Sequence, residues 1–156
     1  FAIIVIVQEQ PDGFRILNDA TRIWADGRVE QLGWPRVDIT YKSGTRHPEH
    51  AVIELATAEG PLTLQVDTLL GAHIHFGGGY GGDADWVHGQ WNGPSFSERL
   101  TYDLANPSVA DRIPFGVTDH VARATCDGAV GWGMLEHGSI GRHDPSGFAD
   151  LGSVAP

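Results

Sequence analysis

The chain has 156 residues and a formal net charge of −10, because ten basic residues stand against twenty acidic ones. Its length is typical of one domain, its 41% hydrophobic and 19% charged residues are typical of a globular protein, and we expect a single domain over residues 1–156. The acidic balance excludes a nucleic-acid-binding surface and disfavours binding to anionic membranes, and a lone cysteine excludes an internal disulfide and a cysteine zinc cluster.

The first predicted strand covers residues 2–8, which are apolar and largely β-branched. This apolar run is too short to span a bilayer, and it lacks the basic flank of a signal peptide. We therefore expect no membrane insertion and a cytoplasmic location, which is compatible with the single Cys126. Because the chain begins at Phe1 rather than Met, we also expect a processed or trimmed piece of a longer protein.

Further β-rich runs separated by turn signals follow along the chain, and amphipathic helical periodicity is nearly absent. Asp-Gly pairs at 26–27 and 127–128 predict tight hairpins that tolerate positive φ, and residues 106–115 are expected to form a loop or short helix. The remaining predicted strands lie at residues 14–24, 28–32, 37–41, 52–57, 62–70, 86–91, 96–104, 120–126 and 129–140. Their spacing predicts an all-β fold, an antiparallel barrel of about eight to ten strands with room for one small ligand; a filled β-sandwich is the alternative.

The densest group of chemically active residues lies between residues 73 and 91. His73 and His75 share one strand face, as in cupin metal sites, but glycines occupy the stretch where a cupin has its glutamate. A solvated strand face explains the two histidines better, and we expect no metal and no cofactor. The glycine-rich loop at 77–82 lacks the lysine of a phosphate loop, and Asp83 and Asp85 would repel an anion. The glycines fit a tight bend or a close approach of the backbone to a ligand.

Two later strands carry tryptophans together with ionisable residues. In residues 130–137, one face would hold Val130, Trp132, Met134 and Glu136, because side chains alternate along a strand. If this face is buried, Glu136 is a carboxyl group with a raised pKa, which suits a general acid. The alternative is a structural ion pair between Glu136 and Arg142 or Arg123.

Nucleophilic catalysis has little support in the sequence. Cys126 has no adjacent base, and no Gly-x-Ser-x-Gly turn is present. Asp119-His120 and Arg142-His143-Asp144-Pro145 both fit strand ends and turns.

Three short motifs carry a resemblance to a known family. They are residues 86–91 (WVHGQW), residues 119–123 (DHVAR) and residues 131–143, which contain GWGMLEHG and GRH. The chain resembles the lipocalin-like superfamily of AttH proteins and carotenoid hydratases, and in particular the C-terminal unit of an uncharacterised bacterial branch. The resemblance implies a lipocalin-like barrel that pairs with a second one, and a cofactor-independent activity on hydrophobic isoprenoid substrates.

The function we expect is therefore acid–base hydration, dehydration or isomerisation of a terpenoid-like molecule. The acid would be Glu136 or Asp85, and the base or water-orienting group would be His88 or His137. The apolar wall that tolerates a cationic intermediate would contain Trp86, Trp91, Trp132, Met134, Tyr80 and Tyr102.

Two other functions use the same sequence features. A non-catalytic carrier of a small lipid or terpenoid would need the cavity but no ionisable pair, and a structural β-domain would need neither. The expected partners are a small hydrophobic molecule and either a second copy of the chain or a second lipocalin-like domain.

Overall fold

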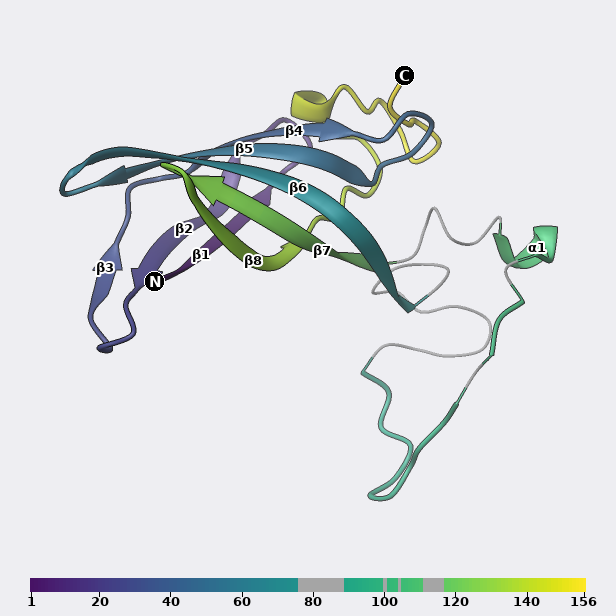
Figure 1. The fold of residues 1–156 in the computed structure, drawn as a ribbon. Helices are drawn as coiled ribbons and strands as arrows, with labels where there is room; N and C mark the ends of the chain where they lie inside the picture. Colours follow the sequence, from purple (N-terminus) through teal and green to yellow (C-terminus); the bar gives the residue numbers. More distant parts are fainter. Residues whose placement is uncertain (76–88, 100, 104, 111–116) are drawn as a thin grey trace.

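The computed structural model describes residues 1–75, 89–99, 101–103, 105–110 and 117–156. Within them, eight strands form two antiparallel sheets, and Figure 1 shows the five-stranded sheet curving over the three-stranded one. The three-stranded sheet has the order β1 (Ala2–Glu9), β2 (Arg15–Ile23), β3 (Val29–Gln31). The five-stranded sheet has the order β4 (Arg36–Tyr41), β5 (Pro48–Thr57), β6 (Gly60–His75), β7 (Val117–Cys126), β8 (Ala129–Glu136).

Both predicted hairpins form, with different turns. Between β7 and β8, Asp127 and Gly128 have φ values of 47° and 80°, as a two-residue turn with two left-handed positions requires. Between β2 and β3 only Gly27 has positive φ, at 84°, and a longer loop is closed by the bond from Trp24 N to Arg28 O. The sequence therefore predicted both reversals, but the loop length was correct only for the second.

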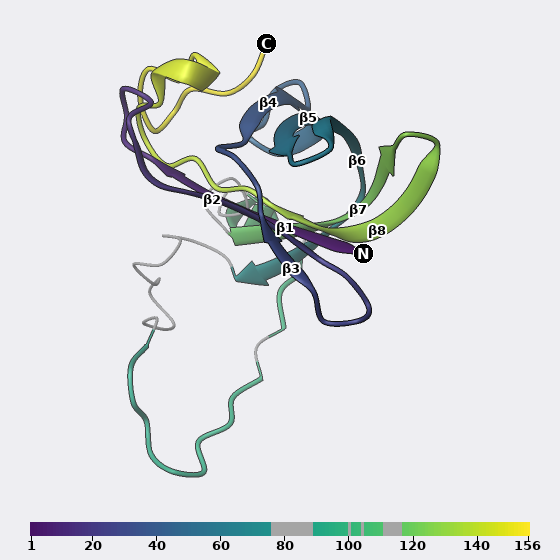
Figure 2. The ribbon, with the colours of Figure 1, turned by 90° about the vertical axis from the view of Figure 1, so that its left-hand side faces the viewer.

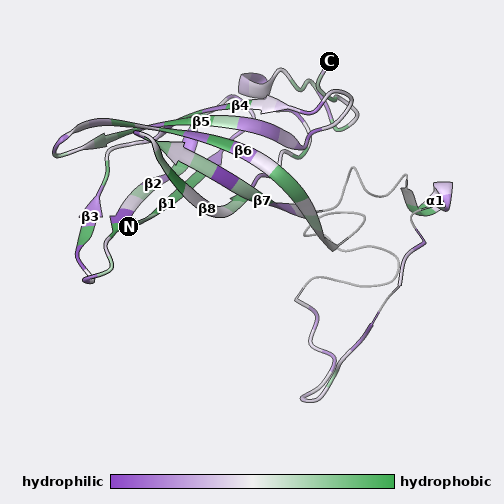
Figure 3. Ribbon diagram, in the orientation of Figure 1, coloured by the Kyte–Doolittle hydropathy of each residue, from purple (hydrophilic) through white to green (hydrophobic). Residues whose placement is uncertain are grey.

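The core lies between the sheets, on the inner face of β5 and β6. Alternate residues of these strands are buried, and Ala20 of β2 and Leu32 pack against them. Figure 3 shows hydrophobic stretches along β1 and β6. The buried positions on the two central strands are Ala51, Ile53, Leu55, Leu62, Leu64 and Val66. This period of two is the pattern of a sheet with one face in the core.

The all-β prediction is confirmed, but the described residues do not form a closed barrel. β1 and β8 are the edge strands of different sheets, and although Figures 1 and 2 place them near each other, no hydrogen-bonded ladder joins them. The chain passes between the sheets through Gly33-Trp34-Pro35, where the buried Pro35 has no N–H to donate to a ladder. The structure is thus an open pair of sheets.

Other strand predictions fail within the described residues. Residues 96–99 and 101–103 have no regular secondary structure rather than forming a strand, and residues 89–91 are a turn and loop. The short helix expected near 106–115 is present as α1 (Pro107–Ala110). No helix in the described part of the chain is long and apolar enough to cross a membrane.

Candidate functional site

A cavity of about 2150 Å³ lies between the two sheets. It is larger than the pockets that enclose a drug-sized ligand. β1 and β8 both contribute runs of neighbouring residues to its wall, as expected where a cavity opens between two strand edges. Its apolar wall contains Ile3, Val5, Val37, Ile39, Ile53, Leu64, Val66 and Leu135.

A chain of five polar side chains lies in the wall of this cavity, and we call it the polar chain. It begins with Glu9, at the end of β1, and continues through His143, Ser146 and Tyr41 to His137. The successive contacts are Glu9 Oε2–His143 Nε2 at 3.0 Å, His143 Nδ1–Ser146 Oγ at 2.8 Å, Ser146 Oγ–Tyr41 Oη at 2.7 Å and Tyr41 Oη–His137 Nε2 at 3.0 Å. All five residues line the cavity.

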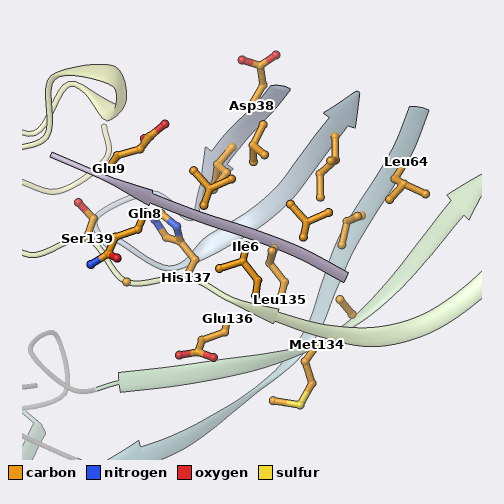
Figure 4. A pocket seen from close by; sticks show the side chains of 18 of the residues that line it. Ile6, Gln8, Glu9, Asp38, Leu64, Met134, Leu135, Glu136, His137 and Ser139 are labelled. Atoms are coloured by element: carbon orange, nitrogen blue, oxygen red, sulfur yellow. The ribbon is translucent and has the colours of Figure 1, made fainter. Parts of the chain in front are cut away.

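Each member reaches this place for a local reason. Tyr41 follows Val37 and Ile39 on the inner face of β4, and His137 continues the inner side of Leu135 one residue after the end of β8. Figure 4 shows His137 and Glu9 on the same side of the cavity, near the end of β1.

His143 and Ser146 come from the 3₁₀ turn Asp144–Ser146 and the residue that precedes it. The following Gly147 adopts φ 73°, which ends the turn at Ser146. The His143–Phe148 bridge fixes both ends of this short segment.

Proton positions along the polar chain are strongly constrained, because each contact needs exactly one donor. If the Glu9 carboxylate accepts from His143 Nε2, then Nδ1 of a neutral His143 accepts from Ser146. Ser146 then accepts from Tyr41, and Tyr41 accepts from Nε2–H of His137. In a second arrangement that keeps the Glu9 carboxylate, His143 is protonated and every hydrogen between His143 and His137 is reversed.

Burial keeps the far end of the polar chain uncharged at neutral pH. Burial is the largest cause and, together with the nearby imidazoles of His143, His120 and His47 as like charges, it lowers the pKa of His137 to about 4. Burial also raises the pKa of the Tyr41 phenol. The Glu9 carboxylate acts in the opposite direction and raises the pKa of His137 in part, and Arg15 Nε binds the other oxygen of Glu9 at 2.8 Å.

The low pKa of His137 predicts an acid-sensitive fold. The unfolded imidazole takes up a proton near pH 6.5, whereas the folded one stays neutral to about pH 4, so the stability present above pH 6.5 is lost as the pH falls through this window. Between pH 6.5 and 5 the wild type should lose about 2 kcal/mol more than the His137→Gln variant. Urea unfolding at pH 7, 6 and 5 measures this difference.

The matched control for this pH effect is His50→Gln. His50 lies on the outer face of β5, where its Nδ1 is 2.8 Å from Asp67 Oδ1. The His137→Gln variant should lose less stability between pH 7 and pH 5 than this control, and a His137→Gln variant as steep as wild type would contradict the burial argument.

The prediction that the Glu136 face of β8 is buried is wrong. Val130, Trp132 and Met134 are 51%, 69% and 66% exposed, and Glu136 is exposed as well. Figure 4 shows Met134 and Glu136 on the opposite side of β8 from Leu135. Both faces of β8 contribute to the lining of the open cavity, which includes Trp132, Met134 and Glu136 as well as Gly131, Gly133 and Leu135. Gly131 and Gly133 have open space beside them. Apolar composition misleads about burial here because β8 is an edge strand, whose outer face is exposed.

The other predicted site residues have different positions. Trp91 is 77% exposed, and Tyr102 is partly buried outside the cavity wall. His137, predicted as a base, is brought into contact with Tyr41. Arg142 binds Asp144 at 2.8 Å. Some residues singled out in the sequence lie outside the described part of the chain: Tyr80, Asp85, Trp86, His88 and the glycine-rich loop. The side chains of His73 and His75 also lie outside it.

Four members of the polar chain were not identified as site residues from the sequence. Tyr41 and Glu9 carried a usable signal, since each is the last inward position of an otherwise apolar strand face. His143 and Ser146 lie in irregular chain, where no period places a side chain. Within the described residues, no group of three histidine, cysteine or acidic side chains could hold a metal ion.

Comparison with known proteins gives one match. No curated protein and no solved structure matches the chain. A family model described as a family of unknown function (DUF8625) matches residues 9–149, which include every member of the polar chain and all of β2 to β8. The chain therefore belongs to this family of unknown function, DUF8625.

Proposed function

We propose that this protein hydrates, dehydrates or isomerises a small hydrophobic, terpenoid- or isoprenoid-like molecule by acid–base catalysis without a cofactor. The observation that carries the proposal is the polar chain, which connects two imidazoles through two hydroxyl groups in the wall of an apolar cavity. The apolar wall would hold the hydrocarbon, and the polar chain would exchange a proton with its reacting end.

The polar chain can take up a proton at one end and hold the charge at the other. A proton that binds Nδ1 of His137 allows Nε2 to pass its own proton to Tyr41, Tyr41 to pass its proton to Ser146, and Ser146 to pass its proton to His143 Nδ1. His137 is then neutral again, and His143 carries the charge 3.0 Å from the Glu9 carboxylate. The reverse movement delivers a proton from His137.

This arrangement suits reactions that both add and remove a proton. With its pKa near 4, a protonated His137 is a stronger acid than an ordinary imidazolium, which an alkene or hydroxyl group requires. The proton that water loses in the next step can be taken back along the same path. In this mechanism the acid is His137, whose pKa burial lowers. His137 therefore takes the role first expected for Glu136, a carboxyl group whose pKa burial would have raised.

The resemblance to AttH proteins and carotenoid hydratases is part of this proposal. A lipocalin-like architecture is supported by the consecutive order of β4 to β8 and by a cavity between the sheets. Completion by a second copy or a second lipocalin-like domain is supported by β1, an apolar strand with one edge that no described strand pairs with and with Ile4 and Ile6 about half exposed.

The test is deuterium transfer from solvent. The protein is incubated in D₂O with an acyclic isoprenoid alkene and, separately, with the corresponding tertiary alcohol, and products are analysed by mass spectrometry. We expect the hydrated or isomerised product to carry deuterium on carbon, because a proton from the polar chain becomes a C–H bond.

A carrier is the second candidate, supported by the predominance of apolar residues in the cavity wall. Binding is measured in parallel by displacement of a fluorescent hydrophobic probe. Probe displacement with neither a deuterated product from the alkene nor an alkene product from the alcohol would identify a carrier and overturn the catalytic proposal.

A further inference from the structure

We propose that Ser146 is a nucleophile, activated by His143 and positioned with the help of Glu9, and that the same cavity cleaves neutral esters with an apolar acyl chain. This activity is separate from the proposed acid–base reaction, although it uses three members of the polar chain. It rests on the order of the three groups in space, because an imidazole stands between the serine hydroxyl and the carboxylate.

The contacts are those that serine activation requires. Ser146 Oγ lies 2.8 Å from His143 Nδ1, and the other ring nitrogen, Nε2, lies 3.0 Å from Glu9 Oε2. The carboxylate holds the Nε2–H tautomer, which leaves Nδ1 able to accept the serine proton. Here the base is Nδ1 rather than Nε2, and Nε2 rather than Nδ1 faces the carboxylate. The roles of nucleophile, base and orienting carboxylate are nevertheless all filled.

Position and support also favour this assignment. Ser146 is partly exposed and lines the cavity, at the end of a turn held by the His143–Phe148 bridge. Glu9 is fixed from its other side by Arg15 at 2.8 Å. Ser146 is therefore accessible to a ligand in the cavity, while Arg15 holds Glu9 in place and the bridge to Phe148 holds His143.

Tyr41 supplies a donor for the negative charge that develops on the carbonyl oxygen. Its Oη lies 2.7 Å from Ser146 Oγ, and burial raises its pKa, so the hydroxyl stays protonated. When Ser146 Oγ becomes bonded to the acyl carbon, Tyr41 can turn its hydrogen to the neighbouring oxyanion.

The reaction is an ordinary acyl transfer to water. The Ser146 Oγ–carbon bond forms as the proton moves to His143 Nδ1, and the ester C–O bond breaks as the alcohol leaves with that proton. Water then attacks the acyl group, gives a proton to His143, and releases the carboxylic acid as the proton returns to Ser146.

The charges of the wall determine the substrate class. Arg15, Arg46 and Arg142 line the cavity, and each is already bound to acidic or carbonyl oxygens of the protein. Among the described residues, none of these cations is left to neutralise an anionic ligand. Neutral esters with an apolar acyl chain fit this wall better than charged ones.

The test uses an alkyl fluorophosphonate, which reacts with activated serines. The Ser146 Oγ–phosphorus bond forms, the phosphorus–fluorine bond breaks, fluoride leaves and the proton stays on His143. We expect a single adduct, mapped to Ser146 by peptide mass spectrometry of the wild-type protein, and hydrolysis of p-nitrophenyl octanoate that the probe abolishes. An adduct on another residue, or none in excess probe, would overturn the assignment.

Matched variants separate reactivity from folding. Ser43→Ala removes an exposed hydroxyl outside the cavity wall, and it should label at the wild-type rate. Ser146→Ala should not label, and His143→Gln should slow ester hydrolysis by about 100-fold or more. Because the adduct is mapped on the wild type, a variant that fails to fold leaves the test intact.

Glu9 is a positioning residue, and its test needs a signal that a structural role would not change. In Glu9→Gln the amide can donate to His143 Nε2, which moves the ring proton to Nδ1 and blocks the base. We expect slower labelling together with a change of tautomer in the ¹⁵N spectrum of His143, and Glu9→Asp should partly restore both. Slower labelling with an unchanged tautomer would contradict the assigned role.

The two proposals fail separately. Labelling of Ser146 without deuterium transfer would retain the nucleophile and remove the hydratase or isomerase activity. Deuterium transfer without labelling would do the opposite.

Discussion

Replacing Tyr41 by phenylalanine is expected to lower turnover of the isoprenoid substrate by about 100-fold or more, which is the size of a typical general acid–base contribution. The hydroxyl is the central link of the polar chain, 2.7 Å from Ser146 Oγ and 3.0 Å from His137 Nε2. Without it, no proton passes between the two imidazoles. The ring itself is retained, and so is its edge contact with Phe148 at 5.1 Å. Steady-state kinetics should show the loss in kcat, with KM changed by less than a few fold.

The matched control for this variant is Glu136→Gln. Glu136 is an exposed residue of the cavity lining and is not a member of the polar chain, so its substitution should leave kcat near wild type. A Tyr41→Phe variant with full activity would show that the polar chain only stabilises the fold. A large loss in Glu136→Gln would return the catalytic role to the residue first suggested by the sequence.

The strands could be predicted because their signals are local. The period of two on β4 and β5 and the Asp-Gly turn between β7 and β8 each depend on residues close in sequence. Whether the sheets close, and which face of β8 is inside, depends on distant packing. Trp132 and Met134 predicted a buried face, but this face is exposed because β8 is the edge strand of its sheet.

The site could be predicted only in part for a related reason. His137 could be selected as a candidate from the residues around it in the sequence. The other members of the polar chain come from residues 9, 41 and the 143–146 segment. Glu9 and Tyr41 are more than 90 positions away from His137. Such contacts appear only once the C-terminal segment is folded against the β4–β5 loop. The organisation of the site therefore depends on whatever holds that segment in place.

Arg46 holds that segment, and Arg46→Met is expected to lower the free energy of unfolding by about 3 kcal/mol. Its guanidinium donates to the carbonyl oxygens of Ser153 at 2.6 Å, Ser139 at 2.9 Å and Gly141 at 2.8 Å, and to that of Asp150. It also lies over the buried Phe148 ring, 4.4 Å from the centroid. Methionine retains apolar bulk but leaves these carbonyl groups without their donor.

The same substitution should release residues 139–156 from the sheets, and with them His143 and Ser146. Limited proteolysis should then cleave this segment before the strands, and urea unfolding should give the loss of stability. Arg36→Met is the matched control, because Arg36 is 69% exposed and its ion pairs with Asp38 and Glu54 lie at the surface; it should cost less than about 1 kcal/mol. Equal losses in the two variants, or a protected C-terminal segment in Arg46→Met, would show that the C-terminal segment is held by its backbone contacts with Gly44 and Thr45 instead.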